Sequence, residues 1–203
     1  MRTGAPGRNG STREGRIDVV LTHGHYDHIG NVDYFTQAQF YMSSTEFQFW
    51  TGPTSRHATF AHLVEAAEID ELRRLDEQGR LTKVDSTTDL APGIRLTALG
   101  GHTPGELVAS VQTADGVLLL ASDAVHFYEE LEQGRPFAHM TDLVAAHSSY
   151  DVIREGLRSG DISRVIPGHD PKVLDGAGAT SSPFIVSLSP SPKTTPKPNT
   201  KEQ

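Results

Sequence analysis

The chain has 203 residues, of which 36% are hydrophobic, and its formal net charge is -8 at pH 7. This length fits one domain. The acidic balance, with no basic patch, argues against nucleic acid or a membrane surface as a partner. No apolar run approaches a membrane span, and residues 1–16 lack the apolar stretch of a signal peptide. A cytoplasmic protein is therefore expected.

Cysteine is absent. Disulfides, thiolate metal sites and cysteine nucleophiles are therefore excluded. Any metal must be held by nitrogen and oxygen atoms, a set of donors that suits zinc, manganese, iron or nickel.

Apolar periodicity and turn residues predict the elements between residues 17 and 175. In chain order they are a strand at 17–22, a helix opening over 27–35, a strand at 39–42, a helix through Trp50 with its N-cap offered by Ser43-Ser44-Thr45-Glu46, a helix over 59–78, strands at 81–84, 94–99, 107–113 and 117–121, a helix over 141–158 and a strand at 163–166. We expect one domain over 17–175, a flexible segment at 1–16 and a disordered Ser/Pro/Lys-rich tail at 176–203.

The densest group of metal-binding side chains is the heptapeptide Thr22-His23-Gly24-His25-Tyr26-Asp27-His28, directly after the first strand. Side chains two positions apart on extended backbone point the same way, so His23 and His25 can hold one ion together. Asp27 and His28 follow where the chain turns away and can reach a second ion. One loop histidine is usually a surface residue, but three with a carboxylate in six positions predict a metal site.

Three later strands end in the same way, with a His or an Asp in the first turn. His102 lies in Gly-Gly-His-Thr-Pro-Gly, Asp123 in Ala-Ser-Asp-Ala, and His169 in Pro-Gly-His-Asp. Each alone could be a turn residue or an N-cap. Four strand ends that share the pattern predict that these side chains converge.

With these residues the chain resembles the metallo-β-lactamase superfamily of hydrolases, over about Arg16 to Leu174. The resemblance implies an α/β fold, an αββα sandwich with a binuclear site at one edge. Carried over by position, the first metal is held by His23, His25 and His102, the second by Asp27, His28 and His169, and Asp123 bridges the two. The implied cofactors are two divalent metal ions, with zinc expected, that share a hydroxide able to attack an acyl carbon.

The presence of Asp123, together with the segments Gly-Gly-His-Thr-Pro-Gly and Ala-Ser-Asp-Ala, makes the sequence most similar to relatives of the N-acyl homoserine lactonases. The resemblance therefore implies a metal-dependent hydrolase that opens the ring of a small lactone or ester by means of the metal-bridging hydroxide. A glyoxalase II-like thioesterase and a non-catalytic, truncated remnant stay open as alternatives. Dimerisation is common among the proteins it resembles, so a homodimer also stays open.

Lactonases of this type commonly carry Tyr three residues after the bridging Asp, where it donates to the substrate carbonyl. This chain has His126 there, and we take Asp27 and His126 as the candidate catalytic residues. The remaining histidines are expected to be surface or helix-facing: His57, His62, His139 and His147.

Members of this superfamily normally have several strands before the first histidine of the motif. Here only 22 residues precede His23. We therefore expect a sandwich that lacks its first strands, with apolar sheet surface and an open strand edge exposed.

Overall fold

The computed structural model describes residues 17–175, 178–179 and 185–188. The elements in chain order are β1 (Asp18–Val20), α1 (Tyr26–Ile29), η1 (Val32–Tyr34), β2 (Gln39–Ser43), α2 (Ser44–Thr51), η2 (Thr54–Arg56), α3 (Ala58–Ala61), α4 (Ala66–Glu77), β3 (Leu81–Val84), β4 (Thr87–Ala91), β5 (Ile94–Leu99), β6 (Glu106–Thr113), β7 (Gly116–Ser122), α5 (Tyr128–Gln133), α6 (Leu143–Ser159), β8 (Arg164–Pro167), η3 (Pro171–Leu174), β9 (Gly178–Ala179) and β10 (Val186–Ser187).

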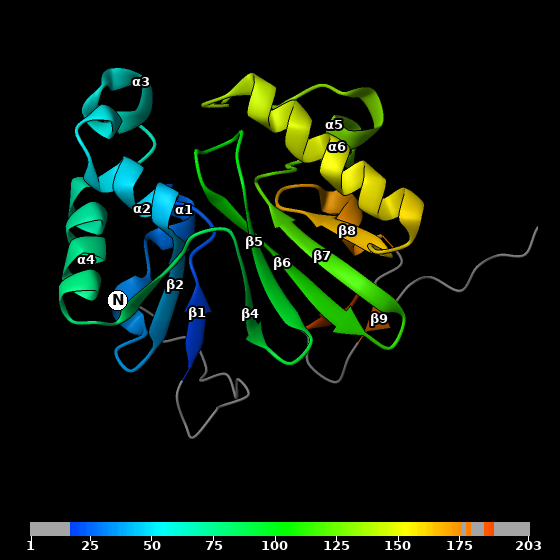
Figure 1. The fold of residues 1–203 in the computed structure, drawn as a ribbon, viewed down its shortest axis with the longest axis horizontal. Helices are drawn as coiled ribbons and strands as arrows, with labels where there is room; N and C mark the ends of the chain where they lie inside the picture. The colour runs from blue at the N-terminus through cyan, green and yellow to red at the C-terminus, as the bar shows by residue number, and fades with distance from the viewer. Residues whose placement is uncertain (1–16, 176–177, 180–184, 189–203) are drawn as a thin grey trace, which may run out of the picture.

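Two sheets form the centre of the molecule, one in the order β1-β2-β3 and the other in the order β4-β5-β6-β7-β8. Helices α2 and α4 lie beside the first sheet, and α5 and α6 lie beside the second (Figure 1). Leu96 and Leu107 from the second sheet pack with Val84 from the first, which makes the layer between the sheets. The predicted αββα sandwich is confirmed.

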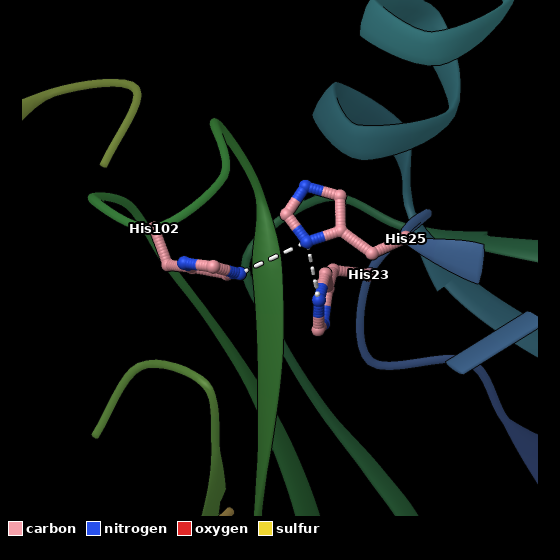
Figure 2. A group of neighbouring side chains, drawn as sticks. All are labelled: His23, His25 and His102. Atoms are coloured by element: carbon pink, nitrogen blue, oxygen red, sulfur yellow. Dashed lines mark hydrogen bonds between the residues drawn. The ribbon is translucent and has the colours of Figure 1, made fainter. Parts of the chain in front are cut away.

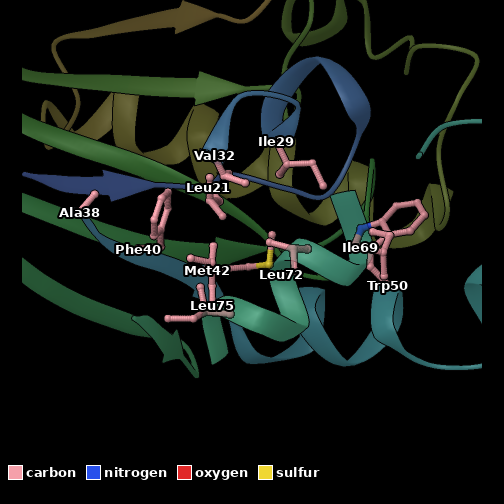
Figure 3. Close-up of a cluster of buried hydrophobic side chains, with 11 residues drawn as sticks. Leu21, Ile29, Val32, Ala38, Phe40, Met42, Trp50, Ile69, Leu72 and Leu75 are labelled. Atoms are coloured by element: carbon pink, nitrogen blue, oxygen red, sulfur yellow. The ribbon is translucent and has the colours of Figure 1, made fainter. Parts of the chain in front are cut away.

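Each outer layer has its own apolar core. Phe40 and Met42 on β2 pack with Leu72 and Leu75 on α4, and all four are fully buried (Figure 3). Beneath α6, Tyr150 and other residues pack on β6, β7 and β8. Residues two apart on one strand, such as Leu119 and Ala121 on β7, face the same core.

Strand directions determine which loops meet. Strands β1, β2 and β3 are parallel, and β8 is parallel to β7. Parallel neighbours end at the same edge, so the turns that follow β7 and β8 emerge side by side. Those turns carry Asp123 and His169.

The predicted helix over 59–78 is wrong, because it is two helices, α3 and α4, separated by residues 62–65. The carbonyl of Leu63 accepts a bond from the backbone N–H of Tyr26 at 3.1 Å. This tertiary bond uses an acceptor that a continuous helix would need for its own ladder. The predicted helix at 27–35 likewise divides into α1 and η1, and β4 and α5 were not predicted.

Part of the inner sheet surface is open to solvent. Leu119 on β7 faces the α6 side and is 3% exposed, whereas Leu120, pointing to the opposite face, is 39% exposed. The exposed apolar sheet surface and open strand edge expected from the sequence stay a prediction. Residues 1–16 and most of 176–203, predicted to be flexible, lie outside the described residues, and β9 pairs with β10 within the latter range. Among the described helices, none has the length and apolarity needed to span a bilayer.

Candidate metal centre

The histidine-rich loop is anchored at its start by backbone hydrogen bonds. Before it, Leu21 N–H donates to Tyr41 O on β2, and the carbonyl of Thr22 accepts from Leu107 on β6, both at 2.8 Å. After it, α1 begins with His25 as its N-cap residue. The loop therefore sits between the two sheets, where it reaches side chains from both.

Three imidazoles meet at one point (Figure 2). His25 Nδ1 lies 3.1 Å from His23 Nε2 and 3.0 Å from His102 Nε2. His102 comes from the turn after β5, and its Nδ1 donates to the carbonyl of His139 at 2.8 Å. That bond directs Nε2 of His102 inward, toward the other two rings.

Burial keeps these rings neutral. It lowers the pKa of His25 to about 3, with help from the nearby charge of His102. Burial, followed by the nearby charge of His126, lowers the pKa of His102 to about 4. The pKa of His23 is also well below its usual value, mainly because of burial. Neutral imidazoles present lone pairs, which is the form that binds a metal.

Asp123 lies at the centre of the whole cluster. Its Oδ2 is 3.1 Å from His169 Nε2, 3.5 Å from His102 Nε2 and 3.9 Å from His23 Nε2. Its Oδ1 is 3.4 Å from His28 Nε2. Burial would raise the pKa of Asp123, but hydrogen bonds from His126 and His28 and the charges of nearby histidines bring it below its usual value. Asp123 is thus held as a carboxylate with ligand-forming groups on both sides.

The other predicted residues form a second group beside the first. Asp27 Oδ2 lies 3.7 Å from His28 Nε2, and with His169 these two can offer three ligand atoms to one ion. Their side chains are more open, since Asp27 is 43% exposed and His169 is 42% exposed. The structure therefore brings all seven predicted ligands together, and their roles as ligands stay a prediction.

The donor set fits metal ions. A single N–H on His25 Nδ1 cannot serve both imidazole nitrogens that approach it, whereas one cation can be shared by three lone pairs. The buried atom His25 Nε2 has no hydrogen-bond partner. Four overlapping groups of three side chains could each hold an ion: His23/His25/His102, His23/His28/Asp123, Asp27/His28/His169 and His102/Asp123/His126.

A cavity of about 400 Å³ opens next to these side chains. Besides the candidate ligands, its wall contains Leu63, Phe127 and Phe137. The ring of Phe137 stacks on His126, with centroids 4.3 Å apart. The cavity thus joins a polar, metal-binding end to an apolar wall, a combination typical of small-molecule sites.

A family model described as the metallo-beta-lactamase superfamily matches residues 10–169. This chain belongs to the metallo-β-lactamase superfamily. The seven clustered side chains are those that the resemblance to this superfamily predicted as ligands.

Individual relatives are longer than this chain. The probable metallo-hydrolase YflN of Bacillus subtilis (strain 168) is 30% identical over 129 residues, 55% of this chain and 46% of YflN. A quorum-quenching N-acyl homoserine lactone lactonase of known structure is 25% identical with a TM-score of 0.65, covering 77% of this chain and 59% of that one. AidC, a dizinc quorum-quenching lactonase, shares the fold at 23% identity and a TM-score of 0.62, over 76% of this chain and 57% of AidC. The chain thus spans roughly half to three-fifths of these relatives.

His126 lies between two carboxylates. Its Nε2 is 3.3 Å from Asp123 Oδ2, and its Nδ1 is 3.3 Å from Glu130 Oε1. Burial alone would lower the pKa of His126, but hydrogen bonds to Asp123 and Glu130, with their charges, raise it to about 9. The ring also lines the cavity.

Sequence reasoning missed three buried glutamates around the centre. Glu106 Oε1 accepts from the backbone of Asp123 at 2.7 Å, Glu130 accepts from the backbone of His126 at 3.1 Å, and Glu46 bonds the loop of His23 and His25. Their sequence signal is faint, because glutamate on a strand or helix is usually exposed. The prediction for His57, His62, His139 and His147 is confirmed, because all four are exposed.

Proposed function

We propose that this protein is a metal-dependent hydrolase that opens the ring of a lactone with an apolar acyl substituent, similar to an N-acyl homoserine lactone. The observation that carries the proposal is the convergence of four overlapping metal-capable groups, two of which contain Asp123, beside a cavity with apolar residues in its wall. The lactonases among the similar structures support the choice of substrate class.

Two divalent ions, for which we propose zinc, would supply Lewis acidity and lower the pKa of bound water to near 7. We assign His23, His25 and His102 to the first ion, Asp27, His28 and His169 to the second, and Asp123 to both. The buried, neutral rings of the first group are ready to bind without losing a proton.

The remaining side chains would bind and orient the substrate. His126 lines the cavity, and its Nε2, which lies 3.3 Å from Asp123 Oδ2, is the atom that would donate a hydrogen bond to the carbonyl oxygen of the ester. Phe127, Phe137 and Leu63 would contact the acyl substituent and exclude water from it. Asp27 lines the cavity and its side chain is 43% exposed, so it would contact water that enters the cavity. Overall, water adds across the ring ester and gives a hydroxy acid.

The test is an assay of the full chain loaded with Zn²⁺, Mn²⁺ or Co²⁺, with acid release measured on a panel of acyl homoserine lactones. Hydrolysis that depends on metal and is abolished by a chelator is expected. S-lactoylglutathione is the comparison substrate, and faster turnover of this thioester would favour the thioesterase reading. Two bound metal equivalents without turnover of either class would overturn the enzymatic proposal.

Replacement of a histidine outside the candidate site is the control for replacement of a candidate ligand. His147 lies on α6, is exposed, and belongs to none of the four metal-capable groups among the described residues. We expect His147→Ala to retain the activity of the parent chain, whereas His102→Ala loses it.

A further inference from the structure

Glu46 is a buried carboxylate that accepts hydrogen bonds from three nitrogen donors. It lies on α2 and is 0% exposed. Its Oε1 accepts from the backbone N–H of Gly24 at 3.0 Å and from Trp50 Nε1 at 2.5 Å, and its Oε2 accepts from the backbone N–H of Gly105 at 3.0 Å. A carboxylate suits this surrounding because it is an acceptor at both oxygens.

The two backbone donors belong to different halves of the sandwich. Gly24 lies between His23 and His25 in the loop after β1, at the end of the first sheet. Gly105 closes the turn of His102 after β5, in the second sheet. One side chain thus connects the two loops that supply the three converging imidazoles of Figure 2.

Both loops approach α2 as closely as backbone can. A Cβ atom added at Gly24 would lie 2.3 Å from Trp50 Cδ1, and one added at Gly105 would lie 2.4 Å from Ser43 Oγ. Only glycine fits at either position, because any side chain would push the loop away from Glu46. The ring of Trp50 also packs edge-on against His25, with centroids 5.3 Å apart.

We propose that Glu46 is a positioning residue for the first metal site, which holds the His23/His25 loop and the His102 turn at the spacing that one ion requires. It acts through the backbone N–H groups of Gly24 and Gly105. The proposal rests on the first ligand set assigned above and is independent of lactone as the substrate. Groups that orient ligands typically change metal affinity by about 10–100-fold.

A purely structural role would also make Glu46 costly to replace, so stability alone cannot test the proposal. The separating measurement is the affinity and the visible absorption spectrum of bound Co²⁺, which report ligand geometry. The test variant is Glu46→Gln, which keeps the shape of the side chain. Its amide nitrogen would face an N–H donor on one side, so one loop loses its acceptor.

The matched control is Ser55→Ala. Ser55 is also buried, and it bonds the carbonyls of Trp50 and Gly52 at the far end of α2. Its loss removes buried hydrogen bonds from the same helix without touching either ligand loop. We expect Glu46→Gln to weaken Co²⁺ binding by about 10–100-fold and to change the Co²⁺ spectrum. Ser55→Ala should change neither. This difference should hold even if the two variants lower the stability of the metal-free protein by the same amount.

Parent-like Co²⁺ affinity and spectrum in Glu46→Gln would overturn the positioning role. If Glu46→Gln does not fold, Trp50→Phe takes its place, because it keeps a ring but removes one of the three donors to Glu46. A smaller weakening of Co²⁺ binding is expected there, and no change would overturn the proposal. Failure of the parent chain itself to bind Co²⁺ would instead overturn the ligand set and the proposed function.

Discussion

The two halves of the metal centre differ most in how open they are to solvent. His23, His25 and His102 are at most 5% exposed, while the side chains of Asp27 and His169 are 43% and 42% exposed. The buried half is built from two loops that a shared carboxylate connects. The side chains of the open half come from α1 and from the turn after β8. They are accessible to water, which could replace a ligand.

This difference indicates a difference in metal retention. The buried half has its lone pairs free at neutral pH and its loops already at metal-binding spacing, so little has to reorganise when an ion binds. An ion in the open half competes with water and relies on the carboxylate of Asp123. We therefore expect the first site to hold its ion more tightly than the second, and the predictions below test that order.

The largest effect is expected from Asp123→Ala, since Asp123 lies within reach of both halves. Loss of its carboxylate should abolish measurable hydrolysis and release at least one metal equivalent. Elemental analysis together with lactone turnover checks this. The control is Asp115→Ala, in the exposed turn between β6 and β7. Full activity in Asp123→Ala would show that the halves do not depend on a shared ligand.

A pair of variants compares the halves directly. His25→Ala should remove the tightly held ion, with affinity for the first metal lowered by at least about 100-fold, more than for a residue that only orients a ligand. His169→Ala should lower only the occupancy of the weaker site and keep one equivalent bound. Titration with a competing chelator measures both. Equal loss in the two variants would contradict the order inferred from burial.

Metal should also stabilise the fold, because the centre joins both sheets. At a free Zn²⁺ concentration 100 times the Kd, a ligand that binds only the native state adds about 2.7 kcal/mol. For a chain of this size that corresponds to a rise in Tm of about 5–10 °C. Thermal unfolding with Zn²⁺ and with chelator checks it. A non-catalytic remnant with a poorly assembled centre would show no cooperative transition and no shift.

Much of this centre was predictable because each ligand follows a strand. Histidines spaced two apart after β1, and single residues after β5, β7 and β8, carry their own local signal. The helix boundary at 62–65 was not predictable, because the bond between Tyr26 and Leu63 that separates α3 from α4 joins segments far apart in the chain. Apolar periodicity predicts which face of a helix or strand is buried, but it does not predict hydrogen bonds between distant segments.

The role of Glu46 also could not be predicted from local sequence patterns. The segment Ser43-Ser44-Thr45-Glu46 was predicted to supply the N-cap of α2. Ser43 is the residue that does so, since its Oγ accepts from the N–H of Glu46. A glutamate three residues after an N-cap looks like part of a capping box. Its actual partners, Gly24 and Gly105, become neighbours only when the two sheets pack. The burial of Glu46 therefore results from tertiary packing, which local sequence patterns do not predict.

The smallest expected effect concerns His126. His126→Ala should lower kcat by about tenfold, the worth of one hydrogen bond to the substrate carbonyl, and leave metal content unchanged. His126→Tyr, which restores a donor at this position, should recover part of kcat. Turnover and elemental analysis of both variants check this. A loss of metal in His126→Ala would instead make His126 a ligand together with His102 and Asp123, the fourth group that the geometry allows. Unchanged turnover and metal would remove His126 from the site, and would leave Asp27 as the only predicted catalytic side chain at the opening of the cavity.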